Sequence, residues 1–352
     1  MRRLLFIALC FSTLFISQSQ AAIVIRGTSI YDADDMPSLP VEEHFALAAE
    51  AYNNEDYPEA MRQFRIVTTW FPLSPPAKDS HFYLAVCYYY LGEYEFANLS
   101  FSEYLKCQNN PQYFEETLLY KFDMAERFRG GAKRRPFGWR KMPLILSGDK
   151  IALEIYNEII VTTPCHEVAA YALFSKGTML WRDREYCDSI EAFLILIKRF
   201  PKHELAPLAY CAISQIYVER CRMEFQNPDL LALAELNSRK FHMDFPSEEL
   251  LSYVEQDVIS IKELYASGLY ETGLFYERIC KPSASVIYYR KAINQFPETE
   301  VARCCQERLD ALMASPELLD DCECDINEGL VPSTDPCIDP TEVHFYYLDP
   351  QI

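Results

Sequence analysis

The stretches LAAEAYNNEDYPEAMRQFRIVTTWFP (residues 47–72) and LAVCYYYLGEYEFANLSFSEYLKCQNNP (residues 84–111) carry one pattern twice. Four matching pairs of residues lie 37 positions apart. They are Leu47 and Leu84, Tyr57 and Tyr94, Ala60 and Ala97, and Phe64 and Phe101. A proline closes each copy. A repeat of this length, with room for two helices per copy, predicts a stack of helical hairpins.

The order of small and aromatic positions is the tetratricopeptide (TPR) pattern. It returns at Gly177 and Phe193, and again at Gly273 and Tyr289. The sequence therefore predicts an all-α, TPR-type α-solenoid, a superhelical stack of helical hairpins, over residues 41–313. A connecting helix is expected at 248–261 and a capping helix at the end of the stack. Such stacks present extended binding surfaces.

The first 21 residues have the pattern of a signal peptide. A charged start precedes an apolar run over residues 4–16, and small residues at Ser19 and Ala21 provide a cleavage site. An uncut membrane anchor is the alternative. Cys10 follows Leu9 rather than the small residue that a lipid-attachment motif requires. We therefore expect an exported, unlipidated protein in the periplasm, associated with the outer membrane.

Three segments depart from the repeat. Residues 22–40 predict an extended lead-in. Residues 127–146 predict a basic loop inserted in the third hairpin, because glycines and a proline accompany its arginines and lysines. Residues 314–352 carry ten acidic residues and no Lys or Arg, which predicts a largely disordered acidic tail. The residues of the insert that we expect to meet an anionic partner are Arg129, Lys133, Arg134, Arg135, Arg140 and Lys141.

Composition and motifs exclude several functions. The net charge of −19 argues against nucleic acid, whose phosphates need Lys and Arg. No P-loop, Gly-x-Ser-x-Gly or His-Glu-x-x-His motif occurs. The Cys165-His166-Glu167 run is a poor metal site, because adjacent helical residues point in different directions. We expect no enzyme activity, no metal and no cofactor.

The candidate binding residues follow from TPR geometry, in which the first helix of each hairpin lines the concave groove. An aromatic groove suits extended segments with apolar and aromatic side chains. The alternative is that these rings only pack between neighbouring helices. The predicted groove residues are Phe45, Tyr52, Asn53, Asp79, Phe82, Tyr89 and Tyr90.

The solenoid resembles the BamD (ComL/YfiO-like) family of outer-membrane assembly proteins over residues 41–313. The residues that carry the resemblance are Phe71-Pro72-Leu73-Ser74-Pro75, Tyr88-Tyr89, Gly92-Glu93-Tyr94 and Phe296-Pro297-Glu298-Thr299. Three features depart from the family: Ala21-Ala22 stands where a lipid-bearing cysteine is normal, and the basic insert and the acidic tail are additions.

The resemblance implies a periplasmic scaffold that binds proteins and peptides while β-barrel proteins are assembled into the outer membrane. Its implied partners are barrel-assembly proteins and unfolded β-barrel substrates, with peripheral contact to the outer membrane. The alternative is a periplasmic TPR adaptor of cell-envelope, peptidoglycan or division machinery. Such adaptors usually carry an N-terminal coiled coil, and residues 22–40 show no heptad.

Overall fold

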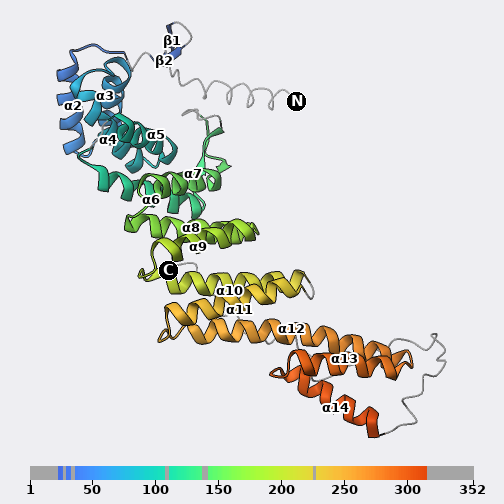
Figure 1. The fold of residues 1–352 in the computed structure, drawn as a ribbon. Coiled ribbons are helices and arrows are strands. Elements are labelled where there is room, and N and C mark those ends of the chain that lie inside the picture. Colours follow the sequence, from blue (N-terminus) through green and yellow to red (C-terminus); the bar gives the residue numbers. More distant parts are fainter. Residues whose placement is uncertain are drawn as a thin grey trace, which may run out of the picture. The chain divides into compact units, whose positions relative to one another are not determined.

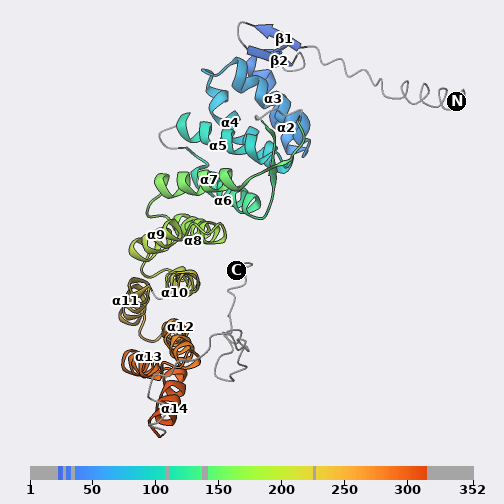
Figure 2. The same cartoon turned by 90° about the vertical axis from the view of Figure 1, so that its right-hand side faces the viewer.

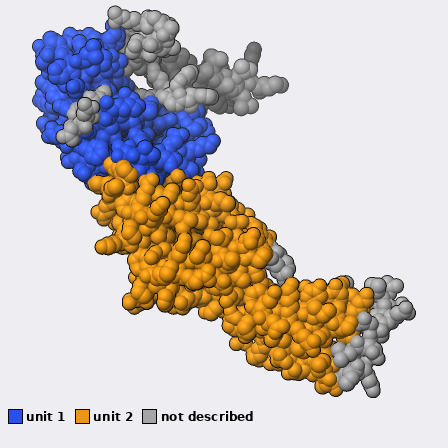
Figure 3. All heavy atoms as spheres, viewed as in Figure 1, with its two compact units in different colours: residues 1–162 blue, residues 163–352 orange. Residues whose placement is uncertain are grey.

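The computed structural model describes residues 23–26, 29–32, 36–107, 111–136, 142–224 and 227–314. The predicted signal peptide, Cys10, Arg140, Lys141 and the acidic tail from residue 315 lie outside the described residues. The predicted TPR-type stack of helical hairpins is confirmed. The chain forms two compact units, Met1–Thr162 and Thr163–Ile352 (Figure 3).

The first unit begins with two short antiparallel strands, β1 (Ile23–Arg26) and β2 (Ser29–Asp32). They lie within the predicted lead-in, which is therefore extended but paired. Three hairpins follow, each stacked on the one before (Figures 1 and 2). Their helices are α2 (Val41–Asn53), α3 (Tyr57–Trp70), α4 (Pro75–Tyr90), α5 (Tyr94–Cys107), α6 (Phe114–Arg129) and α7 (Asp149–Thr162).

The second unit continues the same architecture with three hairpins and a terminal helix. Its helices are α8 (Glu167–Arg182), α9 (Tyr186–Arg199), α10 (Leu205–Met223), α11 (Pro228–Asp244), α12 (Leu251–Arg278), α13 (Pro282–Gln295) and α14 (Glu300–Ala314). The separate connecting helix predicted at 248–261 is wrong. It is continuous with the next helix, because no proline interrupts α12 and its buried positions continue at helical spacing through Val254, Val258, Ile261 and Tyr265.

Phe-Pro pairs end four of the helices. Phe71, Phe200, Phe245 and Phe296 each follow a helix as its C-cap, and a proline comes next in the sequence. A residue before proline is barred from helical backbone by the proline ring, so the helix stops there. Prolines also begin helices, where the missing N–H would have no partner in any case.

A small residue faces an aromatic ring at the seam of each regular hairpin. Gly177 of α8 lies under Phe193 of α9, and Gly273 of α12 lies under Tyr289 of α13. The same spacing of 16 residues relates Ala48 to Phe64 and Ala85 to Phe101, all of them buried. The hairpin helices can therefore approach closely, and this is the physical basis of the repeated small and aromatic positions.

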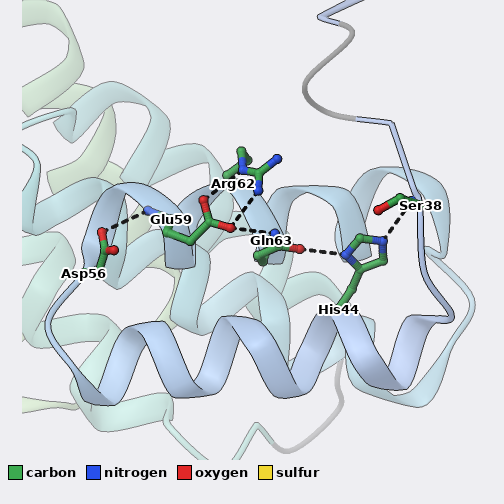
Figure 4. Close-up of polar contacts among 6 residues, drawn as sticks. All are labelled: Ser38, His44, Asp56, Glu59, Arg62 and Gln63. Atoms are coloured by element: carbon green, nitrogen blue, oxygen red, sulfur yellow. Dashed lines mark hydrogen bonds and ion pairs between the residues drawn. The ribbon is translucent and has the colours of Figure 1, made fainter.

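A polar network fixes the start of the first hairpin (Figure 4). Buried His44 on α2 accepts hydrogen bonds at Nε2 from the backbone N–H groups of Ser38 and Leu39, at 3.3 and 3.2 Å. Its Nδ1 therefore donates to Gln63 Oε1 of α3, at 2.6 Å. Gln63 in turn donates to Glu59, which also pairs with Arg62. The network ties the incoming chain to both helices.

A buried lysine joins three helices around the insert. Lys121 of α6 is 0% exposed. Its Nζ donates to Asn98 Oδ1 and Ser102 Oγ of α5, at 2.6 and 2.8 Å, and lies 2.9 Å from Glu158 Oε2 of α7. Burial lowers the pKa of Lys121, and Glu158 opposes that change. Three acceptors match the three N–H donors, so the site is satisfied and structural.

Candidate functional site

Tyrosine rings gather on the first unit over α2, α3, α4 and α6. We define the tyrosine face as Tyr52, Tyr57, Tyr83, Tyr89, Tyr90 and Tyr120. None of these residues is buried, and Tyr90 is the most open at 54% exposed. The face is therefore a connected aromatic surface held by helices, with part of each ring available to solvent.

Two equivalent stacks build the face from the repeat. Tyr83 stacks on Phe64 with ring centroids 5.5 Å apart and planes 16° from parallel. Tyr120 stacks on Phe101 at 5.4 Å and 18°. Both members of the second pair lie 37 residues after those of the first. Tyr83 and Tyr120 thus each rest on a fully buried phenylalanine of the preceding hairpin, which fixes the orientation of these two rings.

The outer part of the face is the pair formed by Tyr57 and Tyr90. Their rings stack with centroids 4.7 Å apart and planes 15° from parallel. Tyr52 lies beside them, with edge-to-face contacts to Tyr57 at 6.2 Å and to Tyr83 at 5.2 Å. Edge and stacked contacts of this kind stabilise aromatic clusters beyond area burial alone. The pair presents an exposed flat ring whose orientation is already fixed.

One charged pair borders the face. The hydroxyl of Tyr89 donates to Asp123 Oδ2 at 2.6 Å, and Arg127 donates to the same hydroxyl at 3.0 Å. The Arg127 guanidinium also lies over the rings of Tyr89 and Tyr94, 5.4 and 5.5 Å from their centroids. Asp123 and Arg127 pair with each other at 2.6 Å. The border is therefore polar but internally neutralised.

The hydroxyls of Tyr52, Tyr57 and Tyr89 remain protonated at neutral pH. Burial raises the pKa of Tyr52 to about 12, and neighbouring Cys87 and tyrosines add to the shift. Burial also raises the pKa of Tyr57 and of Tyr89. Each hydroxyl can thus donate one hydrogen bond and accept others. A surface of flat rings with neutral hydroxyls can stack on apolar side chains and bond to backbone amides.

All of the predicted groove residues except Phe82 are at least partly exposed. Tyr52, Tyr89 and Tyr90 belong to the tyrosine face. Phe45 is half-buried against Phe64, with centroids 5.9 Å apart. Asn53 is exposed at the end of α2, and Asp79 is half-buried on α4.

Phe82 is the exception. It is 6% exposed and stacks on Tyr113 at 4.3 Å, so its assignment to a groove is wrong. Its neighbour Tyr83 faces outward instead, because adjacent helical residues point about 100° apart. Tyr57, Tyr83 and Tyr120 belong to the tyrosine face but are not among the predicted groove residues. The 37-residue interval between Tyr83 and Tyr120 was the pattern that would have identified two of them.

The basic insert is more ordered than the predicted loop. Its first residues, 127–129, belong to α6, which continues until Gly130 and the positive-φ Gly131 (+100°). Cationic side chains are favourable at a helix C-terminus, where carbonyl groups accumulate. Beyond the glycines, β3 (Lys133–Arg134) pairs with β4 (Leu146–Ser147) in an antiparallel ribbon.

Most of the described arginines of the insert pair within the protein. Arg129 bonds to Glu126 at 2.6 Å. Arg134 lies 3.9 Å from Glu95, and Arg135 bonds to Glu93. The pairs of Arg134 and Arg135 link the ribbon to the start of α5, and all three pairs neutralise charges that were expected to meet an anionic partner. Lys133 is the exposed cation of the ribbon.

The described residues hold no group of three or more His, Cys, Asp or Glu side chains arranged to bind a metal. His166 caps α8, accepting a hydrogen bond at Nδ1 from the Val168 N–H at 3.2 Å. No helix in the described part of the chain is both long and apolar enough to cross a bilayer.

No family model and no curated protein matches the chain. Solved structures resemble it at low identity. A TPR repeats protein from Bacteroides fragilis is 9% identical, with 78% of this chain and 99% of that chain covered and a TM-score of 0.38. A tetratricopeptide repeat protein from Parabacteroides merdae is 13% identical, covering 78% and 98%, with a TM-score of 0.32. A TPR2AB-domain complex of yeast Sti1 is 11% identical, covering 79% and 95%, with a TM-score of 0.23.

Proposed function

We propose that the protein is a periplasmic scaffold that binds extended protein segments on its tyrosine face during assembly of β-barrel proteins into the outer membrane. A stack of helical hairpins is an architecture for binding proteins. The observation that carries the proposal is the stacked pair of Tyr57 and Tyr90, which offers an exposed, preoriented ring on rigid helices.

The chemistry of the face matches an unfolded barrel strand. Such a strand alternates apolar and polar side chains and exposes unpaired backbone amides. Tyrosine rings accept the apolar and aromatic side chains, and neutral tyrosine hydroxyls bond to the free N–H and C=O groups. Rigid aromatic anchors lose little conformational entropy on binding, which favours affinity for a flexible segment.

Two further observations support the cell compartment. The first 21 residues have the pattern of a secretory signal. Cys280 is disulfide-bonded, and structural disulfides persist in oxidising compartments such as the periplasm. The resemblance of residues 41–313 to the BamD family supports the assembly role.

The test is peptide binding by fluorescence anisotropy. A labelled C-terminal strand of an outer-membrane barrel should bind the wild type, and Tyr90→Ala should weaken binding about fivefold, since an aromatic contact contributes roughly 1 kcal/mol. Tyr253→Ala is the matched control, because Tyr253 is 43% exposed on α12 of the other unit. Equal affinity of the Tyr90 and Tyr253 variants would refute the tyrosine face as the site.

The cellular role needs a second experiment. Capture of the intact protein from envelope fractions should recover barrel-assembly proteins, and Tyr90→Ala should reduce their yield relative to Tyr253→Ala. Recovery of peptidoglycan or division proteins instead would favour the adaptor role.

A further inference from the structure

Two aromatic clusters of the first unit are repeat copies of each other. Positions 52, 57, 83 and 90 form the first cluster, and positions 89, 94, 120 and 127 form the second, each 37 residues later. Three of the four positions are tyrosines in both copies. The fourth is Tyr90 in the first cluster and Arg127 in the second. The first cluster therefore has an aromatic ring where the second has a cation.

Arg127 covers the rings of the second cluster. Its guanidinium lies 5.4 Å from the centroid of the Tyr89 ring and 5.5 Å from that of Tyr94. The negative face of an aromatic ring attracts a cation placed over it. Asp123 pairs with the same guanidinium at 2.6 Å and supplies the opposite charge. The second cluster is therefore a cation site that the protein fills with its own arginine.

The first cluster has the same rings without the cation. Tyr52 and Tyr57 lie edge to face at 6.2 Å, and the equivalent rings of Tyr89 and Tyr94 are 5.7 Å apart. Tyr90 stacks on Tyr57 at 4.7 Å and is still 54% exposed. Within the described part of the chain, no Lys or Arg side chain lies over the rings of the first cluster. The outer ring is therefore open to a cation from a ligand.

A carboxylate stands beside this open cluster. Glu55 lies in the turn between α2 and α3, where its N–H donates to the C=O of Tyr52 at 3.0 Å and its C=O accepts from the N–H of Tyr57 at 2.9 Å. Its side chain is exposed and forms no ion pair with any described residue. Burial raises the pKa of Tyr57, and the charge of Glu55 adds to the shift. The carboxylate therefore acts on the open rings and lacks a counter-charge.

The backbone at this position favours glycine. Glu55 has a φ of 60°, in the left-handed region, and the equivalent residue of the next hairpin is Gly92, with a φ of 74°. Residues other than glycine are disfavoured there because the Cβ atom crowds the backbone. Local folding therefore does not explain a glutamate in this turn.

We propose that the tyrosine face binds an arginine side chain of the extended protein segment, with the guanidinium stacked on Tyr90 and paired with Glu55. The inference rests on the proposed function and names the ligand chemistry of that same site. A planar guanidinium can stack on a ring and bond to a carboxylate at the same time. The net charge of −19 also favours a cationic segment. In a strand of alternating side chains, the arginine would occupy a polar position.

Two labelled peptides that differ in one side chain test the inference. Both have the same alternating apolar and polar sequence, and the central polar residue is arginine in one peptide and citrulline, an uncharged analogue of similar shape, in the other. In fluorescence anisotropy at low ionic strength, the full chain should bind the arginine peptide about fivefold more tightly. That factor corresponds to a contact of about 1 kcal/mol.

Substitutions locate the preference for arginine. Tyr90→Leu removes the ring without changing the charge, and Glu55→Gln removes the charge without changing a ring. Each should reduce the ratio of the two affinities to about twofold or less. Glu185→Gln is the matched control, because Glu185 is an exposed carboxylate in the turn between α8 and α9 of the other unit. It should leave the ratio unchanged.

The outcomes separate this inference from the proposed function. Equal affinity of the wild type for the two peptides would overturn arginine recognition, even if Tyr90→Ala weakens both and so supports the face as the binding site. A full arginine preference in either the Tyr90→Leu or the Glu55→Gln variant would place the guanidinium elsewhere and overturn it as well. Binding of neither peptide would overturn both proposals.

Discussion

Replacing Gly273 by alanine tests the seam between α12 and α13 most directly. In an exposed helix interior this change stabilises a protein by roughly 1 kcal/mol, because alanine has the higher helix propensity. At position 273 the added Cβ would lie 2.3 Å from Tyr289 Cε1, with two further ring atoms at 2.8 and 2.9 Å. An ordinary contact needs about 3.4 Å, so the ring must move by roughly 1 Å.

The buried ring has little freedom to make that movement. Tyr289 is 0% exposed, and its hydroxyl donates to Glu277 Oε1 at 2.6 Å. Overpacking of a core costs about 1–3 kcal/mol, and weakening this partly buried hydrogen bond adds about 1 kcal/mol. After the gain in helix propensity, Gly273→Ala should lower the free energy of unfolding by about 1–3 kcal/mol.

Urea unfolding followed by far-UV circular dichroism measures this change. Gly177→Ala is the internal comparison, because its Cβ would meet Phe193 at 2.7 Å, a milder clash with a ring that has no hydroxyl. It should destabilise less than Gly273→Ala. Adding Tyr289→Leu to Gly273→Ala should reveal a favourable coupling, since the smaller side chain relieves the clash. If Gly273→Ala stabilises the protein by the ordinary helix gain, the close-packed seam is refuted.

Three further changes test other parts of the structure. Ala97→Leu should destabilise by about 1–3 kcal/mol in urea unfolding, because Ala97 is 0% exposed; an unchanged midpoint would mean that the repeat register is wrong. Lys121→Ala should cost about 2–3 kcal/mol by leaving Glu158, Asn98 and Ser102 without their cationic partner, and a change below about 0.5 kcal/mol would contradict the network around Lys121. Burial raises the pKa of Asp257 to about 6, opposed by Ser214 and Arg222, so the folded state binds its proton more tightly than the unfolded state. Stability from this group is lost as the pH rises from about 4 to 6; Asp257→Asn should therefore stabilise by up to about 2–3 kcal/mol at pH 7 and have little effect at pH 4, and a pH-independent effect would contradict this assignment.

The order of amino acids alone predicts the repeat and most of its helix boundaries. Small and aromatic positions recur because two helices can pack closely only where a small side chain faces a ring, as Gly177 does beneath Phe193. Phe-Pro pairs end helices because proline restricts the residue before it. Both effects act over a few residues or within one hairpin, so they are visible in the order of amino acids.

Which residues of those helices form the surface depends on how the helices pack together. Phe82 and Tyr83 are neighbouring aromatic residues, yet one is core and the other belongs to the tyrosine face. Arg134 and Arg135 form ion pairs with Glu95 and Glu93, which lie about 40 residues away in the sequence. Side-chain exposure and charge pairing depend on which helix packs against which, and contacts between distant segments leave no local pattern in the sequence.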